Sequence, residues 1–125
     1  MSISDAESHV IEFLWINPGA TAAEVHEALG PDRDWQEATV KTLLNRLLNK
    51  GAIRSKRNGR RFQYFPVLER ESWMLTETRH LLDRLFDGRL APLVAHFCAH
   101  QKLSRQDLKD LKSLIHQLED EHPDD

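Results

Sequence analysis

Eight basic side chains crowd into one stretch of this 125-residue chain, and the same stretch contains no acid. Between Glu37 and Glu69 there is no aspartate or glutamate. Positive charge concentrated in this way is the electrostatic pattern of a surface that contacts the phosphate groups of a nucleic acid. A solvated surface that is only locally basic is the alternative. The eight residues are Lys41, Arg46, Lys50, Arg54, Lys56, Arg57, Arg60 and Arg61.

The composition of the whole chain sets broader limits. The net charge of −3 would by itself argue against a polyanionic partner, so it is the distribution of charge that favours one. The single cysteine, Cys98, excludes an internal disulfide framework and fits a reducing compartment. No apolar run approaches membrane-spanning length, and the N-terminus lacks the features of a signal peptide. We therefore expect a cytoplasmic protein without membrane insertion.

The first of the basic residues lie on a predicted helix. Asp34 and Glu37, three positions apart, predict its start, and Gly51 predicts its end, with Lys50 favourably placed in the last turn. Apolar residues recur between these limits at the spacing of one helical stripe. That stripe consists of Val40, Leu43, Leu44, Leu47 and Leu48.

The opposite face of this helix carries no acid and no large apolar group, which suits close approach to a polyanion. Asn side chains favour adenine edges, and Thr can contact the methyl group of thymine. We therefore predict base contacts by Thr42 and Asn45, with solvation alone as the alternative, and phosphate contacts by Lys41 and Arg46. The face comprises Ala38, Thr42, Asn45 and Asn49, flanked by Thr39, Lys41 and Arg46.

A basic β-hairpin is predicted to follow, with Asn58-Gly59 as its two-residue turn and Pro66 closing its second strand. Counting outward from this turn pairs the strands residue by residue, and alternation then sorts apolar from basic side chains. We predict phosphate contacts by Lys56, Arg60 and Arg61, and a contact of Arg57 at the tip with the flanking minor groove. The predicted pairs are Arg57 with Arg60, Lys56 with Arg61, Ser55 with Phe62, Arg54 with Gln63 and Ile53 with Tyr64.

Two more helices are predicted before this region. Ser4 with Glu7, and Thr21 with Glu24, form capping boxes that each open a helix. The second helix is short and is expected to end at Gly30-Pro31. Three helices in this order match a helix-turn-helix, and the hairpin makes the pattern a winged helix. We therefore predict a mainly α protein with a winged-helix DNA-binding domain over residues 1–67.

The spacing of apolar residues over 68–125 predicts three further amphipathic helices. The last of them begins behind a capping box at Ser104-Arg105-Gln106-Asp107. Their apolar faces have no evident partner, since the winged helix closes its own core, and exposed apolar faces usually mark an interface. We therefore predict a helical homodimerisation domain; helices folded back on the N-terminal domain are the alternative. The expected dimer contacts are Trp73, Leu81, Leu82, Leu85, Leu93, Phe97, Leu111 and Ile115.

Other chemistry finds little support in the sequence. His96 and His100 share a helix face, but Cys98 points elsewhere, and two ligands alone make a weak metal site. We therefore predict no metal site and no cofactor. Because the chain has no glycine-rich phosphate loop, no nucleophile elbow and no locally paired carboxylate and histidine, we also predict no enzymatic activity.

Two segments carry a resemblance to a known family: Trp35 to Ile53 (WQEATVKTLLNRLLNKGAI) and Gly59 to Pro66 (GRRFQYFP). Through them the chain resembles the penicillinase-repressor family, the BlaI/MecI/CopY group, and the resemblance extends over nearly the whole chain. It implies a dimeric winged-helix transcriptional repressor bound to a palindromic operator. It further implies base and backbone contacts by Thr39, Lys41, Thr42 and Arg46, and wing phosphate contacts by Arg60 and Arg61.

Two branches of this family imply different modes of induction. In the antibiotic-responsive branch a membrane sensor-protease system triggers cleavage at an Asn-Phe bond, and the aligned pair here is His96-Phe97. The copper-responsive branch carries paired Cys-x-Cys motifs, which the single cysteine excludes. Two rival functions stay open: a metal- or redox-responsive sensor of the same fold using Cys98 and the nearby histidines, and a winged helix that binds proteins.

Overall fold

The computed structural model describes residues 2–121, and these separate into two compact units, the first ending at Glu77 and the second beginning at Thr78. The division falls inside helix α4 (Arg70–Phe86), beyond the boundary at 67/68 expected from the sequence. The reason is local. Trp73 of α4 packs on Trp15 with ring centroids 5.7 Å apart, which joins the start of α4 to the N-terminal unit.

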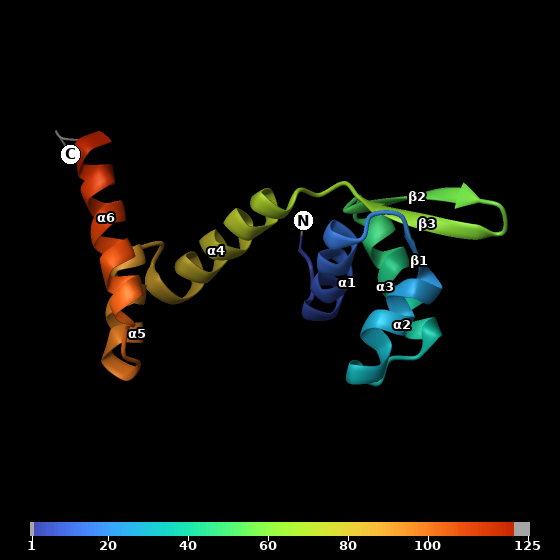
Figure 1. Ribbon diagram of the computed structural model, residues 1–125, viewed down its shortest axis with the longest axis horizontal. Coiled ribbons are helices and arrows are strands. Elements are labelled where there is room, and N and C mark those ends of the chain that lie inside the picture. Colours follow the sequence, from blue (N-terminus) through green and yellow to red (C-terminus); the bar gives the residue numbers. More distant parts are fainter. Residues whose placement is uncertain (1, 122–125) are drawn as a thin grey trace. The chain divides into compact units, whose positions relative to one another are not determined.

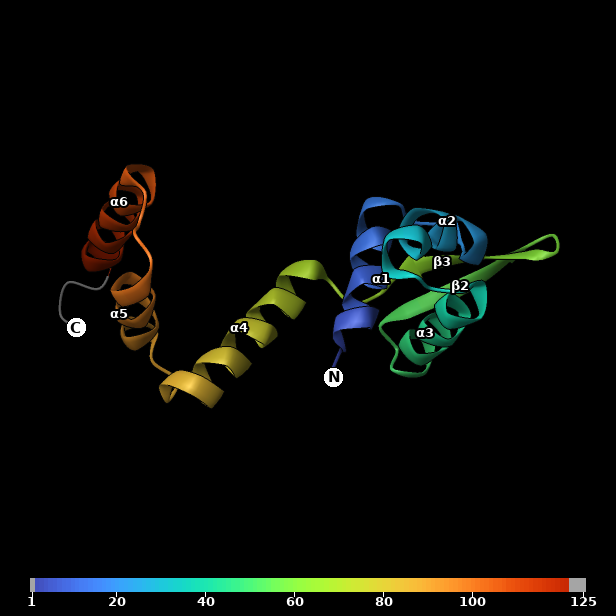
Figure 2. The ribbon, with the colours of Figure 1, turned by 90° about the horizontal axis from the view of Figure 1, so that it is seen from below.

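The N-terminal unit is a winged helix. Three helices lie together, and the end of a β-hairpin projects beyond them (Figures 1 and 2). A short strand that the sequence analysis did not predict pairs with the hairpin, giving the antiparallel strand order β1-β3-β2. The elements are α1 (Asp5–Ile16), β1 (Ala20–Thr21), α2 (Ala22–Arg33), α3 (Glu37–Asn49), β2 (Ile53–Asn58) and β3 (Arg61–Pro66).

The first two helices start where the capping boxes predict. The Ser4 hydroxyl accepts a hydrogen bond from the backbone N–H of Glu7, and the Glu7 carboxylate accepts one from the Ser4 N–H in return. Thr21 and Glu24 make the same reciprocal pair at the start of α2. Each box satisfies backbone donors that have no partner within the helix.

The predicted junction between α2 and α3 was wrong at both ends. Helix α2 continues through Gly30-Pro31 to Arg33, and it ends only where Asp34 adopts a left-handed φ of 55°. Gly30 is needed for packing, since a Cβ there would lie 2.7 Å from the His26 ring. The capping acid predicted for α3 is therefore the C-cap of α2, and α3 begins after Gln36 without a side-chain cap.

The core of the N-terminal unit forms around the predicted apolar stripe of α3. Val40, Leu43, Leu44 and Leu47 are buried, and Leu48 is partly buried at the edge. Because this stripe points inward, the polar face of the helix is left outside. The side chains that meet it are Val10, Ile11 and Leu14 of α1, Val25 of α2, Ala52 from the turn after α3, and Ile53 and Tyr64 of the hairpin.

A buried ion pair joins the two ends of this core. The Lys50 Nζ donates to both carboxylate oxygens of Glu7, at 2.6 and 2.7 Å, and the Glu7 side chain is only 3% exposed. Burial by itself raises the pKa of Glu7, but hydrogen bonds from Lys50 and Ser4 outweigh it, and the net pKa is lowered. Lys50, counted among the basic residues in the sequence, therefore holds α1 against the end of α3.

The C-terminal unit contains the rest of α4, together with α5 (Leu90–His100) and α6 (Arg105–Glu121). Asp87 and Gly88, both at positive φ, separate α4 from α5. Ser104 caps α6 by accepting from the Asp107 N–H at 3.0 Å.

The C-terminal unit buries little within one chain. Among its described residues only Leu82 is buried. The sequence predicts a frayed acidic tail from Glu119 to Asp125, but Glu119 to Glu121 are the last residues of α6, and residues 122–125 lie outside the described residues. None of the described helices has both the length and the apolarity to cross a membrane.

The Glu7–Lys50 pair yields a test of stability. We expect Lys50→Met to lower the free energy of unfolding by about 2–3 kcal/mol, because it leaves the buried Glu7 carboxylate without its cation. The loss is smaller than for a fully buried pair, since the Lys50 side chain is one-third exposed. Glu7→Gln keeps an acceptor for the Ser4 N–H, so it should cost less, about 1 kcal/mol. Urea unfolding monitored by tryptophan fluorescence measures both.

The pH dependence follows from the lowered pKa. A carboxyl group with a depressed folded-state pKa stabilises the fold above its unfolded pKa and loses that contribution as pH falls through the folded value. The stability difference between wild type and Glu7→Gln should therefore be constant near neutrality and shrink below the ordinary glutamate value of 4.5. A difference that persists unchanged in acid would show that the ion pair does not contribute.

Candidate nucleic-acid interface

The outer face of α3 presents the side chains that the sequence assigned to it. Thr39, Lys41, Thr42, Asn45 and Arg46 are all exposed. The Thr42 hydroxyl donates to the Ala38 carbonyl at 3.0 Å, so its proton is used within the helix. What Thr42 offers outward is its methyl group and an acceptor oxygen, which suits an apolar contact with a thymine methyl.

Lys41 has an acidic neighbour on the same helix. Its Nζ lies 3.7 Å from the Glu37 carboxylate one turn earlier, and both side chains are more than half exposed. Exposed pairs at this spacing stabilise a helix by only about 0.3–0.5 kcal/mol, so the lysine is readily available to a stronger anion. Glu37 therefore lies beside the basic face of the helix without neutralising it permanently.

The predicted register of the wing was wrong by two residues. Asn58 pairs with Arg61, so the turn is Gly59-Arg60 rather than Asn58-Gly59. Positive φ falls on Gly59, at 66°, and not on Arg60, which matches a type II′ turn with glycine first. The observed pairs are Ile53 with Pro66, Arg54 with Phe65, Ser55 with Tyr64, Lys56 with Gln63, Arg57 with Phe62 and Asn58 with Arg61.

The predicted division into faces nevertheless holds, because a shift of two residues preserves the alternation of side chains. Ile53, Phe62 and Tyr64 still share one face, and Tyr64 also pairs with Ala20 of β1. Turn chemistry allowed both registers, and this pairing with β1 was not visible in the sequence. The opposite face carries Arg54, Lys56, Arg61 and Gln63.

The shift moves the basic residues of the wing relative to its tip. Arg60 now occupies the turn, while Arg57 lies opposite Phe62. The Arg57 Nε donates to the Gly59 carbonyl at 3.0 Å, and its guanidinium carbon lies 6.0 Å from the Phe62 ring centroid. The exposed Arg54 lies over the Phe65 ring at 4.5 Å.

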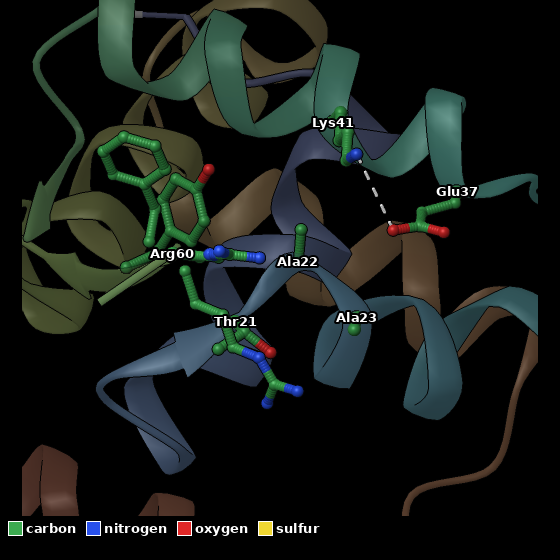
Figure 3. A pocket seen from close by; sticks show the side chains of 9 residues that line it. Thr21, Ala22, Ala23, Glu37, Lys41 and Arg60 are labelled. Atoms are coloured by element: carbon green, nitrogen blue, oxygen red, sulfur yellow. Dashed lines mark ion pairs between the residues drawn. The ribbon is translucent and has the colours of Figure 1, made fainter. Parts of the chain in front are cut away.

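An open cleft of about 300 Å³ lies between the wing and the first turns of α2 and α3 (Figure 3). The part played by α2 was not predicted from the sequence, although the Thr21–Glu24 capping box marks the N-terminus of that helix. Burial raises the pKa of Tyr64, so its phenol stays protonated at neutral pH. The lining residues are Thr21, Ala22, Ala23, Glu37, Lys41, Arg60, Arg61, Phe62 and Tyr64.

The histidines of α5 do not assemble a metal centre with their neighbours. His96 and His100 have ring centroids 5.0 Å apart, and His96 also lies 6.1 Å from Phe86. Cys98, which the sequence placed on an apolar stripe, is exposed. Within residues 2–121 no group of three or more histidine, cysteine, aspartate or glutamate side chains is arranged to hold a metal ion.

Comparisons with known proteins agree with this geometry. Residues 3–117 match the model of a family described as penicillinase repressor. The methicillin resistance regulatory protein MecI of Mammaliicoccus sciuri is 28% identical over 113 residues, covering 90% of this chain and 92% of that protein. The penicillinase repressor of Bacillus licheniformis is 30% identical over 113 residues, covering 90% and 88%.

A solved structure is similar to the N-terminal unit. The monomeric form of Bacillus licheniformis BlaI, in complex with the blaP half-operator, superposes with a TM-score of 0.50 and 34% sequence identity. The match covers 57% of this chain and 87% of that one. It confirms the winged-helix fold predicted for this part of the chain.

The position of the turn can be tested by mutation. We expect Gly59→Ala to lower the free energy of unfolding by about 1 kcal/mol, because an alanine side chain disfavours positive φ. Asn58 lies in a strand, so Asn58→Thr should be neutral or slightly stabilising. Thermal unfolding of the two variants provides the measurement. A clear loss on Asn58→Thr would instead place Asn58 inside the turn.

Proposed function

The chain belongs to the penicillinase repressor family, and we propose that it represses transcription by binding a palindromic DNA operator as a homodimer. The observation that carries the proposal is the joint presentation of an acid-poor helix face and a basic wing by one folded unit. Occupying a promoter in this way would exclude the transcription machinery. The predicted absence of enzymatic activity agrees with membership in a repressor family.

In this proposal α3 enters the major groove. Thr39, Thr42 and Asn45 face base edges, where threonine and asparagine can discriminate between base pairs. Lys41 and Arg46 flank them and neutralise phosphates. The wing supplies further backbone contacts through Lys56, Arg57, Arg60 and Arg61, all of which are exposed. Support for a DNA partner comes from the BlaI relative, which is bound to a half-operator.

The proposed dimer would form through the C-terminal unit. Its helices carry large apolar side chains that a single chain leaves in water, among them Leu85, Phe97 and Ile115, each about half exposed. A second copy of the chain would bury them, and twofold dimers are the commonest soluble assemblies. Leu82 is already buried within its own chain, and Trp73 packs on Trp15. These two predicted contacts would therefore mainly hold α4 in place and contact the second copy little.

Induction by a membrane sensor-protease remains a proposal drawn from the family resemblance. The corresponding bond, His96-Phe97, lies within helix α5, and both side chains are exposed. A protease needs extended backbone, so this turn of α5 would have to unfold before cleavage. A sensor that works through Cys98 is the rival, and its thiol is accessible for such a role.

DNA binding is tested by the salt dependence of affinity. Arg46→Ala should weaken binding to a selected dyad-symmetric duplex, and it should make the log–log salt slope shallower by about 0.9 per lost phosphate contact. Arg79→Ala, which removes an exposed charge from the C-terminal unit, is the matched control and should change neither quantity. Fluorescence anisotropy over a salt series measures both. Wild-type protein that is indifferent to DNA sequence at every salt concentration would favour the protein-binding rival.

Dimerisation is tested by mass in solution. The wild-type chain of 14.5 kDa should sediment as a dimer, and Ile115→Lys should shift it to monomer, because a buried unpaired charge opposes association. Ile16→Lys places the same charge at another exposed apolar residue, in the N-terminal unit, and should leave the dimer intact. A wild-type monomer at micromolar concentration would contradict the proposal.

A further inference from the structure

Phe62 is an exposed aromatic ring on the basic part of the wing. The apolar face of the hairpin begins with Ile53 and Tyr64, which are buried in the core. Phe62 continues that face beyond the core, and the residue is 49% exposed. Core packing therefore does not explain a phenylalanine at this position. Covering its exposed part would be favourable, since burying apolar area is worth about 25 cal/mol per Å².

The surroundings of this ring are cationic. Phe62 lines the cleft together with Lys41, Arg60 and Arg61, and the first turn of α2 forms the opposite wall. The N-terminus of α2 carries its own carboxylate, because Glu24 belongs to the capping box there, so the positive charge of the cleft comes from the three side chains. Glu37 is the single carboxylate on the wall, and it is paired with Lys41. The cleft thus combines an apolar patch with a net positive charge.

The ring is also held in place. Arg57 lies opposite it in the strand pairing, and its guanidinium carbon is 6.0 Å from the ring centroid, within the range of a cation–π contact. The hydrogen bond from Arg57 Nε to the Gly59 carbonyl fixes the guanidinium in turn. Arg57 would therefore position Phe62 as well as contribute charge.

We propose that this cleft seats one sugar–phosphate unit of the DNA backbone, with the phosphate on the cationic groups and the deoxyribose against Phe62. The backbone of DNA repeats an anionic group and a less polar ring at close spacing, and the cleft offers matching groups at close spacing. A free inorganic anion would satisfy the cations but leave the ring in water. The inference rests on the proposed function and adds Phe62 to the DNA-contacting residues.

The test compares apolar and ionic contributions on one duplex. The probe is a mixed-sequence DNA duplex, because a backbone contact should act on any sequence, and the full-length chain is titrated over a salt series. Phe62→Ala should weaken binding on the order of tenfold per half-site while leaving the salt slope unchanged. Arg61→Ala should weaken binding and also flatten the slope by about 0.9. Glu37→Gln should tighten binding, because it removes the carboxylate from the cleft.

Controls separate this effect from a damaged fold. Ile16→Ala truncates another exposed apolar side chain, far from the wing in sequence, and it should bind DNA as wild type does. Phe62→Leu retains an apolar group, so it should fall between wild type and Phe62→Ala. Melting temperatures of all variants are compared first, and Phe62→Leu carries the test if Phe62→Ala does not fold.

Three results would overturn the inference. The first is that Phe62→Ala binds DNA as tightly as wild type. The second is that Phe62→Ala flattens the salt slope as much as Arg61→Ala, which would show that the ring only positions the arginines. Alternatively, inorganic phosphate could displace DNA far better than chloride at equal ionic strength, which would mark a site for free anions. Failure of the proposed function is distinguishable, since wild-type protein would then show no salt-dependent binding to DNA at all.

Discussion

The burial of one apolar stripe of α3 determines which face of that helix is exposed. Val40, Leu43, Leu44 and Leu47 fill the core of the N-terminal unit, which fixes the rotation of the helix about its axis. With 3.6 residues per turn, the residues between them must then face outward. Those residues are the threonines, asparagine and basic side chains assigned to DNA. The same hydrophobic contacts that stabilise the fold therefore orient its candidate reading surface.

The basic residues that surround this surface are not equivalent. Lys50 is committed to the buried carboxylate of Glu7, and this pair ties α1 to the end of α3. Arg57 is held by Gly59 and Phe62, and Arg54 lies over Phe65. A count of charges in the sequence therefore overstates the number that can move freely to meet phosphates. It also hides a structural role for one of them.

Local signals predicted much of this fold because they depend on short spacings. The Ser4 and Thr21 capping boxes, the apolar stripe of α3 and the two faces of the wing each follow from neighbouring residues. The end of α2 was missed for a local reason, since the helix continues through Gly30-Pro31 and stops only at the left-handed Asp34. The other failures involve contacts between distant residues. Tyr64 pairs with Ala20, so the wing register was set by tertiary structure. The Glu7–Lys50 pair and the cleft at the start of α2 escaped prediction for the same reason.

The helices of the C-terminal unit follow the predicted apolar periodicities, yet within one chain they bury only Leu82 among the described residues. Periodicity identifies an apolar face but not the surface that will cover it. A second copy of the chain would supply that cover and would double the DNA surface with twofold symmetry.

The most direct test of the central claim is to map amide chemical shifts of the full-length protein during titration with duplex DNA. If α3, the wing and the start of α2 form one DNA-binding surface, signals from Thr39 to Arg46, from Arg60 to Phe62 and from Ala22 and Ala23 should shift together. Saturation should occur at a single DNA concentration for all three segments. Shifts confined to the C-terminal helices, or to only one of these segments, would contradict the account.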